Sequence, residues 1–153
     1  MIKIATHLPV LELMKRTNIK RILELGSGEY STKKFLEFPD LERLDSYEDD
    51  EIWFDTIRKL KDVRLDMNLE KDLVKVVGEL DLDFYDLIFV DCSKSPEERV
   101  AVIKEIVKQH PKAIVVIHDF ENKIYQAEAK FDHKIIYDEL VPNTAILWNE
   151  NKS

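Results

Sequence analysis

The sequence contains little cysteine, glycine or proline, and it has no long run of apolar residues. Its single cysteine, Cys92, excludes a disulfide within the chain and suits a reducing environment. No apolar stretch is long enough to span a bilayer, and the first residues lack the apolar core of a signal peptide. No linker, repeat or low-complexity tract interrupts the 153 residues. We therefore expect one cytoplasmic domain over residues 1–153, burying ~68–70% of the surface of the unfolded chain.

Positive charge is also scarce. Lys and Arg number 23 against 31 Asp and Glu, which gives a net charge of −8. An acidic surface repels polyanions, so general nucleic-acid binding is disfavoured. The composition gives no indication of a membrane.

The most informative stretch begins with Arg21–Leu25, which reads as a short buried strand ending at residues 26–28, Gly-Ser-Gly. A helix follows, and we expect Ser31 or Thr32 to cap it. Glycines allow positive φ and let a ligand approach the backbone, so this corner is typical of nucleotide-binding α/β sheets. Glu24 would repel a phosphate at the mouth of such a corner, whereas it would attract an ammonium or a sulfonium.

The remaining chain alternates apolar strand patterns with helical ones, which predicts a mostly parallel sheet with helices on both faces. Two consecutive strands at the end predict one antiparallel member at the edge of the sheet. The predicted strands are 21–25, 41–48, 63–66, 83–91, 113–117, 134–140 and 144–148, and the predicted helices are 8–18, one after Gly28, 49–60, 69–80, 96–109 and 123–130.

Four segments, in this order, carry a resemblance to a known family. They are residues 24–28 (Glu-Leu-Gly-Ser-Gly), 46–50 (Ser-Tyr-Glu-Asp-Asp), 86–91 (Asp-Leu-Ile-Phe-Val-Asp) and 115–119 (Val-Val-Ile-His-Asp). Together they resemble the core motifs of class I S-adenosylmethionine-dependent methyltransferases. The resemblance implies an α/β three-layer sandwich with a seven-stranded Rossmann-like sheet. It also implies S-adenosylmethionine as the cofactor, and an O or N methyl acceptor of unknown identity. We expect a small molecule or a protein as the acceptor, and a specific RNA stays an alternative.

The cofactor residues follow from this alignment and from the spacing of the acids. Glu48 lies 22 positions after Gly26, near the ~20-residue spacing at which an acid accepts hydrogen bonds from ribose hydroxyls. Glu24 is expected to meet the methionine ammonium, and Asp66 with Met67 is expected to end a strand beside the adenine. The full predicted set is Glu24, Gly26, Ser27, Gly28, Tyr30, Ser31, Glu48, Asp49, Asp66, Met67 and Asp91.

The predicted catalytic residues are Asp91, His118 and Asp119, because each lies where a central strand ends. In one interpretation, one of them accepts a proton from the methyl acceptor. In the other, the two aspartates hold Mg²⁺ as in some small-molecule O-methyltransferases, with Asn122 as an uncertain third ligand. We assign no metal ligands from the sequence.

Two further groups of side chains are less specific. His7 reads as a surface-loop residue by default, or as one that folds over the cofactor. Lys94, Arg99, Lys104 and Lys108 read as the solvated face of a helix. The alternative function is a non-catalytic nucleotide-binding or interaction module with the same fold. A nicotinamide-dependent oxidoreductase is a poorer choice, since Glu24 would face its pyrophosphate.

Overall fold

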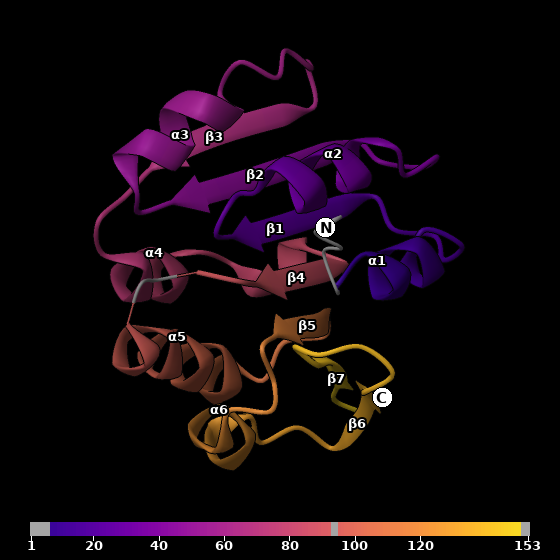
Figure 1. Cartoon of the computed structure of the whole chain (residues 1–153), viewed down its shortest axis with the longest axis vertical. Helices are drawn as coiled ribbons and strands as arrows, with labels where there is room; N and C mark the ends of the chain where they lie inside the picture. Colours follow the sequence, from indigo (N-terminus) through magenta and orange to yellow (C-terminus); the bar gives the residue numbers. More distant parts are fainter. Residues whose placement is uncertain (1–6, 93–94, 151–153) are drawn as a thin grey trace.

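The computed structural model describes residues 7–92 and 95–150 as one seven-stranded sheet with helices around it (Figure 1). The strands lie side by side in the order β3-β2-β1-β4-β5-β7-β6. The elements are α1 (Leu8–Met14), β1 (Arg21–Leu25), α2 (Glu29–Leu36), β2 (Arg43–Glu48), α3 (Glu51–Ile57), β3 (Leu65–Leu69), α4 (Leu73–Glu79), a short 3-10 helix (Leu82–Phe84), β4 (Leu87–Val90), α5 (Pro96–Gln109), β5 (Ile114–His118), α6 (Lys123–Glu128), β6 (His133–Tyr137) and β7 (Thr144–Trp148).

The predicted fold class is confirmed. Strands β1 to β5 are all paired in parallel, whereas β7 runs antiparallel to both β5 and β6. The antiparallel strand therefore lies one place in from the edge of the sheet, which β6 forms. None of the helices in the described ranges is long and apolar enough to cross a membrane.

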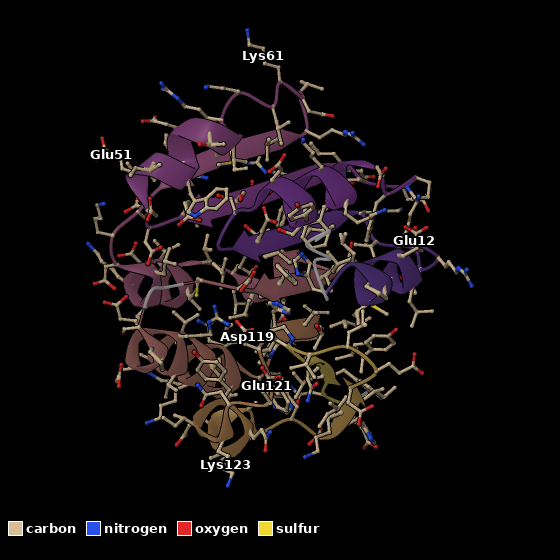
Figure 2. The ribbon with its side chains drawn as sticks, in the orientation of Figure 1. Glu12, Glu51, Lys61, Asp119, Glu121 and Lys123 are labelled. Atoms are coloured by element: carbon tan, nitrogen blue, oxygen red, sulfur yellow. The ribbon has the colours of Figure 1, made fainter. Side chains whose placement is uncertain are left out.

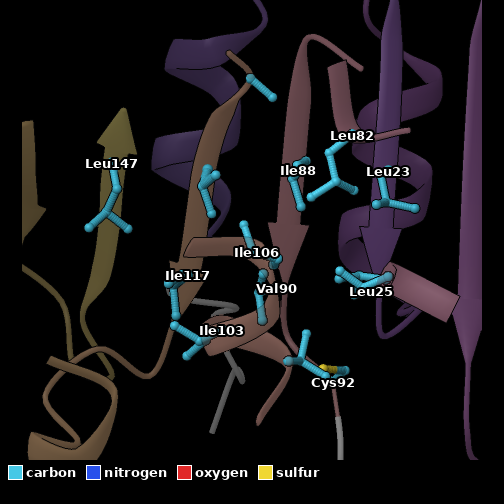
Figure 3. Packing of buried hydrophobic residues seen from close by; sticks show 14 of the residues in the cluster. Leu23, Leu25, Leu82, Ile88, Val90, Cys92, Ile103, Ile106, Ile117 and Leu147 are labelled. Atoms are coloured by element: carbon cyan, nitrogen blue, oxygen red, sulfur yellow. The ribbon is translucent and has the colours of Figure 1, made fainter. Parts of the chain in front are cut away.

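The two faces of the sheet have separate cores because side chains alternate along each strand. Leu23 and Leu25 face one side, where they join residues of β4, β5 and β7 under helices α4, α5 and α6. Ile22 faces the other side, against α1 and α2. Figure 3 shows the first of these cores, with Ile103 and Ile106 of α5 beside Val90 and Ile117. The peripheral charged side chains, such as Glu12 and Lys61, point outward (Figure 2).

The boundaries of β3 differ from the prediction. The strand was expected over residues 63–66, but it spans Leu65–Leu69. Arg64 binds Asp62 through its backbone and side chain, which closes a turn before the strand, and Val63 is fully exposed there. The strand is polar because it lies at the edge of the sheet, so apolar patterning did not indicate its extent.

The carboxyl ends of the parallel strands all meet at one edge of the sheet. Strands β1 and β4 are neighbours there, and the chain order reverses between them. Ligands of open α/β sheets bind in the crevice at such a switch point. The fold therefore gathers the glycine turn, Glu48, Asp91 and residues 118–119 at the edge where a ligand is expected.

Candidate functional site

A cavity of about 360 Å³ opens at this edge of the sheet. Its lining comes from residues 27–31 after β1, residues 48–50 at the end of β2, Trp53 of α3, Asp91 after β4 and His7 before α1. Segments far apart in the sequence thus meet on both sides of the switch point between β1 and β4. Five of the lining residues are acidic, and no lysine or arginine of the described chain is among them.

Gly26 fixes the turn beneath the cavity. Its φ of +93° is in the region that favours glycine, and a Cβ there would overlap the backbone carbonyl of Asp91. Its N–H donates to the carbonyl of Tyr47 at 2.8 Å, so the turn is fixed to β2 on one side while it touches β4 on the other. Gly28 is extended, with a φ of −154°, and α2 begins directly after it.

Glu24 lies below the glycine turn and does not line the cavity. Its carboxylate is fully buried and accepts hydrogen bonds from Ser31 Oγ at 2.6 Å, Thr32 Oγ1 at 2.7 Å and Ser46 Oγ at 2.7 Å. Burial raises the pKa of Glu24 to about 7, against the three hydroxyl groups that lower it. The expected contact with a methionine ammonium is therefore replaced by a hydroxyl cluster that ties α2 and β2 to β1.

The same hydrogen bonds correct the expected helix cap. Ser31 and Thr32 lie inside α2, whose N-cap is Gly28 and which has no side-chain cap. Their hydroxyl groups turn down to Glu24 because a buried carboxylate needs donors more than an exposed helix end does. Thr32 Oγ1 also accepts from the N–H of Gly28 at 3.2 Å.

Glu48 ends β2 at the wall of the cavity. One carboxylate oxygen accepts from Ser27 Oγ at 3.3 Å, and the other accepts from the N–H of Asp50 at 2.9 Å. Burial raises the pKa of Glu48 to about 7, and the neighbouring Asp49 raises it further. The carboxylate is thus held in one orientation, joined to the glycine turn, with a high affinity for a hydrogen-bond donor or a positive charge.

Arg99 joins the ends of β4 and β5. This buried side chain of α5 reaches Asp91 Oδ1 at 3.2 Å and Asp119 Oδ2 at 3.3 Å. It also donates to the backbone carbonyls of Cys92 at 2.7 Å and His118 at 3.1 Å. The expectation of a solvated helix face was wrong for Arg99. It holds for the exposed Lys104 and Lys108, and Lys94 lies outside the described residues.

The contacts of Arg99 with Asp91 and Asp119 also bear on the magnesium alternative. A guanidinium lies between the two aspartates and supplies the positive charge that a divalent ion would bring. Asn122, the uncertain third ligand, uses its side-chain oxygen to cap α6 through the N–H of Ile124 at 3.0 Å. These residues therefore do not form a carboxylate–carboxylate–amide metal site.

His118 and His7 lie together behind Asp91. Their rings meet edge to face with centroids 4.8 Å apart, and both side chains are buried. Thr144 Oγ1 lies 3.2 Å from His118 Nδ1, and Asp119 Oδ1 lies 3.7 Å from Nε2. Burial lowers the pKa of His7 to about 4, so its ring is neutral near neutral pH. Asp119 has a φ of +60°, a strained conformation of the kind found at functional sites, and Figure 2 shows it by the end of β5.

Comparisons with known proteins identify the fold and nothing finer. No protein-family model matches the sequence, and no curated protein matches it. A methyltransferase structure from Geobacter sulfurreducens covers 98% of this chain and 81% of its own, with a TM-score of 0.72 at 12% identity. The O-methyltransferase TomG from Streptomyces achromogenes, in complex with S-adenosylmethionine, covers 98% and 82%, with a TM-score of 0.64 at 17% identity.

A spermidine synthase in complex with the analogue AdoDATO is also similar, with a TM-score of 0.71 at 12% identity. It covers 90% of this chain, but this chain spans only 57% of its length. The chain has the fold of class I S-adenosylmethionine-dependent methyltransferases. At these identities the likeness concerns the backbone, so the roles of individual side chains depend on the geometry above.

Within this methyltransferase fold, the predicted site residues fall into three groups. Ser27, Gly28, Tyr30, Ser31, Glu48, Asp49 and Asp91 line the cavity. Gly26, Glu24, His118 and Asp119 lie directly around it without lining it. Asp66 and Met67 are not brought to it, because they lie inside β3 rather than at its end. The side chain of Asp66 instead pairs with Arg43 at 3.1 Å.

Three residues outside the predicted set contribute to the site. Trp53, whose place in the sequence fits the adenosine pocket and aromatic core packing equally well, is 47% exposed and lines the cavity. His7 is buried and lines the cavity, so the surface-loop interpretation is wrong and the alternative, a residue that folds over the site, stays a prediction. Arg99 precedes the buried Ile103 by four positions and Ile106 by seven, so it lies on the inner stripe of α5. That helical spacing is the signal that would have identified Arg99.

Proposed function

We propose that this chain binds S-adenosylmethionine in the cavity and transfers its methyl group to an oxygen or nitrogen of a small-molecule or protein acceptor. The observation that supports this most strongly is the acidic cavity at the switch point of the sheet. It combines a fixed carboxylate at the end of β2 with a glycine turn at the end of β1.

The charge of the cavity favours this cofactor over others that bind similar folds. Glu29, Glu48, Asp49, Asp50 and Asp91 line it, and no basic side chain of the described residues faces them there. A pyrophosphate would be repelled by such a lining, whereas a sulfonium and an ammonium are attracted. The lining therefore argues against a nicotinamide dinucleotide.

The position of Glu48 suits a ribose. Its two oxygens are oriented by Ser27 and by the backbone of Asp50, and each oxygen can accept a second hydrogen bond. Two neighbouring ribose hydroxyls would donate to them. Trp53 and Tyr30, which are about half exposed at the cavity, offer flat apolar surfaces to the adenine.

The reacting end of the ligand would lie toward Asp91. The cofactor supplies a methyl group on a positively charged sulfur, which is already reactive, so the chain has mainly to align the acceptor and exclude water. A proton lost by the acceptor can pass to His118 Nε2 or to Asp119 Oδ1, which lie 3.7 Å apart at the end of β5. Arg99 holds Asp91 and Asp119 in place.

Calorimetric titration with S-adenosylmethionine and its product S-adenosylhomocysteine tests the proposal. We expect micromolar binding of both, and Glu48→Ala should weaken it by about 10-fold to 100-fold, because hydrogen bonds to a charged group contribute about 1.5–3 kcal/mol. Glu51→Ala is the matched control, since Glu51 is exposed at the start of α3 and does not line the cavity.

Absence of binding heat for both ligands, together with an unchanged melting temperature, would remove the methyltransferase proposal. The fold would then serve the non-catalytic alternative. If binding is found, radioactive methyl transfer from S-adenosylmethionine to panels of small molecules and proteins tests catalysis itself. Asp119→Asn should then lower transfer while leaving cofactor affinity within about twofold, because Asp119 does not line the cavity.

A further inference from the structure

Three potential metal ligands converge at the inner end of the cavity. One ring nitrogen from each of His7 and His118 and one carboxylate oxygen of Asp91 all lie within 4.8 Å of one another. They come from three separate places in the chain: the residue before α1, the end of β4 and the end of β5. This set differs from the two-aspartate site considered above, in which Arg99 takes the central position.

The burial of the His7 ring is not balanced by any hydrogen bond within the described residues. The residue is 93% buried, since its exposed fraction is 7%, and neither ring nitrogen has a hydrogen-bond partner among the described residues. A buried polar group without a partner costs about 1–3 kcal/mol, so such groups in native proteins call for a ligand or another role. The ring is aimed at His118 and Asp91, where a bound ion would give it a partner.

His118 and Asp91 are already oriented for the same ligand. Thr144 Oγ1 engages His118 Nδ1 at 3.2 Å and leaves Nε2 for a metal, which is how ligating histidines are usually held. Arg99 engages Asp91 through Oδ1 at 3.2 Å, and Oδ2 has no hydrogen bond within the described part of the chain. Each residue therefore offers one atom while another atom fixes its direction.

We propose that His7, Asp91 and His118 bind a divalent cation of the zinc class, with one coordination position open toward the cavity. Two imidazoles and a carboxylate suit Zn²⁺ and similar borderline ions, whereas Mg²⁺ prefers oxygen ligands alone. Three protein ligands with an open fourth position are typical of catalytic rather than structural zinc sites. His7 and Asp91 both line the cavity, so the open position faces it.

Binding requires a small movement. Zn–N distances of about 2.0–2.1 Å place two ligand atoms of a tetrahedral site about 3.4 Å apart, so the side chains must draw in by roughly 1 Å. His7 is the residue free to do this, because it precedes α1 and its side chain does not cap that helix. The ion therefore completes the site.

One consequence rests on the proposed function. An acceptor oxygen or nitrogen held at the open position would lie in the cavity that the cofactor shares. His118 Nε2 would then hold the ion, so the acceptor's proton would pass to Asp119, whose Oδ1 lies 3.7 Å from that nitrogen. The assignment of the metal site itself does not need the cofactor.

Titration of the metal-free, chelator-treated protein with ZnCl₂, CoCl₂ and MgCl₂, without S-adenosylmethionine, tests the site. We expect one saturable Zn²⁺ or Co²⁺ per chain and no competition from Mg²⁺. His7→Gln and His118→Gln should each weaken Zn²⁺ binding at least about 10-fold, and Thr144→Val should weaken it about 10-fold to 100-fold through loss of orientation. His133→Gln should leave Zn²⁺ binding unchanged, because His133 begins β6, away from the site, and pairs there with Glu150.

Three results would overturn the proposal: no saturable Zn²⁺ binding, binding that survives both His7→Gln and His118→Gln, or binding that His133→Gln abolishes. If a site variant fails to fold, histidine NMR signals of the wild-type protein decide the matter. Zn²⁺ should shift the signals of His7 and His118 and leave those of His110 and His133 in place, and the reverse pattern counts against the site. Cofactor binding without metal binding would refute this inference and leave the proposed function intact.

Discussion

The two halves of the carboxyl edge of the sheet use acidic residues in opposite ways. At the ends of β1 and β2, Glu48 and Asp49 face a cavity that no arginine or lysine of the described residues lines. At the ends of β4 and β5, Asp91 and Asp119 are bridged by the buried Arg99. In the first half the negative charge faces the cavity without a basic side chain beside it, whereas in the second it is paired with Arg99, which joins two loops.

The difference teaches that an acid at a strand end is not by itself a binding group. Burial raises the pKa of Glu48 to about 7, and no Lys or Arg among the residues that line the cavity opposes this rise. Burial also raises the pKa of Asp91, although His118 and Arg99 act against it. Removing Arg99, which acts against that rise, should therefore destabilise the folded chain, whereas neutralising Glu48 should stabilise it.

The largest effect is expected from Arg99→Met. Loss of one partner from a buried ion pair typically costs about 3–5 kcal/mol. Because Asp91 and Asp119 are partly exposed, we expect the variant to lose about 3 kcal/mol of free energy of unfolding, the lower end of that range, in urea titrations at pH 7.5. Lys104→Met, on the exposed face of the same helix, should change it by less than about 0.5 kcal/mol.

The double variant Arg99→Met, Asp119→Asn separates charge from packing. Because the second change removes one of the two uncompensated carboxylates, we expect it to recover about 1–2 kcal/mol of the loss. No recovery would mean that Arg99 acts through its bonds to the carbonyls of Cys92 and His118 rather than through the aspartates.

The second effect concerns Glu24 and pH. Its pKa is raised by burial to about 7, from 4.5 in the unfolded chain, so the folded state binds the extra proton between these values. The stability that this proton contributes is complete below pH 4.5 and is lost as pH rises through 7, with a total of about 3 kcal/mol at 1.36 kcal/mol per pKa unit.

Glu24→Gln should remove this pH dependence, and thermal or urea unfolding from pH 5 to pH 8.5 would measure it. The pH dependence of the wild type alone does not isolate Glu24, because His7 contributes an opposite dependence. Its pKa is lowered from 6.5 to about 4 in the folded state, so protonation of His7 destabilises the fold as pH falls below 6.5. The difference between the wild type and the variant isolates Glu24. An equal slope for both proteins would show that the hydroxyl cluster keeps Glu24 ionised.

The sequence predicted the fold well because its buried strands carry unbroken apolar runs. Residues 87–90 and 114–117 are covered on both faces, so their patterns are unambiguous. Pro96 with its Ser95 cap marked the start of α5, and the helix begins there. The predicted bounds of β3 were wrong because this strand lies at the edge of the sheet. An edge strand can have a polar sequence, and such a sequence lacks the apolar pattern from which strands are predicted.

The site was predicted in outline but not in its connections. Strand ends could be counted from the sequence, which placed Glu48 and Asp91 at one edge of the sheet. Which acids are neutralised could not be read from the sequence, because Arg99 reaches Asp119 from a separate element, 20 positions away. The two interpretations of His7 could not be decided from the sequence for the same reason, since the burial of its ring depends on tertiary contacts with Phe89 and His118.

A third and smaller effect is expected from Glu48→Gln. Its ionised form is disfavoured by burial, so a neutral amide of the same shape should raise the free energy of unfolding at pH 8 by about 1 kcal/mol. The same change should weaken cofactor binding. Chemical denaturation and calorimetry on one preparation measure both quantities, and a loss of stability would mean that the bonds to Ser27 and Asp50 outweigh the desolvation.

The smallest effect is the response to salt, which separates the two halves directly. S-adenosylmethionine carries one more positive charge than S-adenosylhomocysteine, and the cavity that would receive it is open and acidic. Raising ionic strength from about 0.05 M to about 0.5 M shortens the Debye length from ~14 Å to ~4 Å, so the affinity ratio of the two ligands should fall about twofold to threefold. The cost of Arg99→Met should stay constant over the same range, because buried pairs are screened little. Equal salt dependence for both ligands would place the sulfonium away from the acidic residues that line the cavity, and would contradict a reacting end that lies toward Asp91.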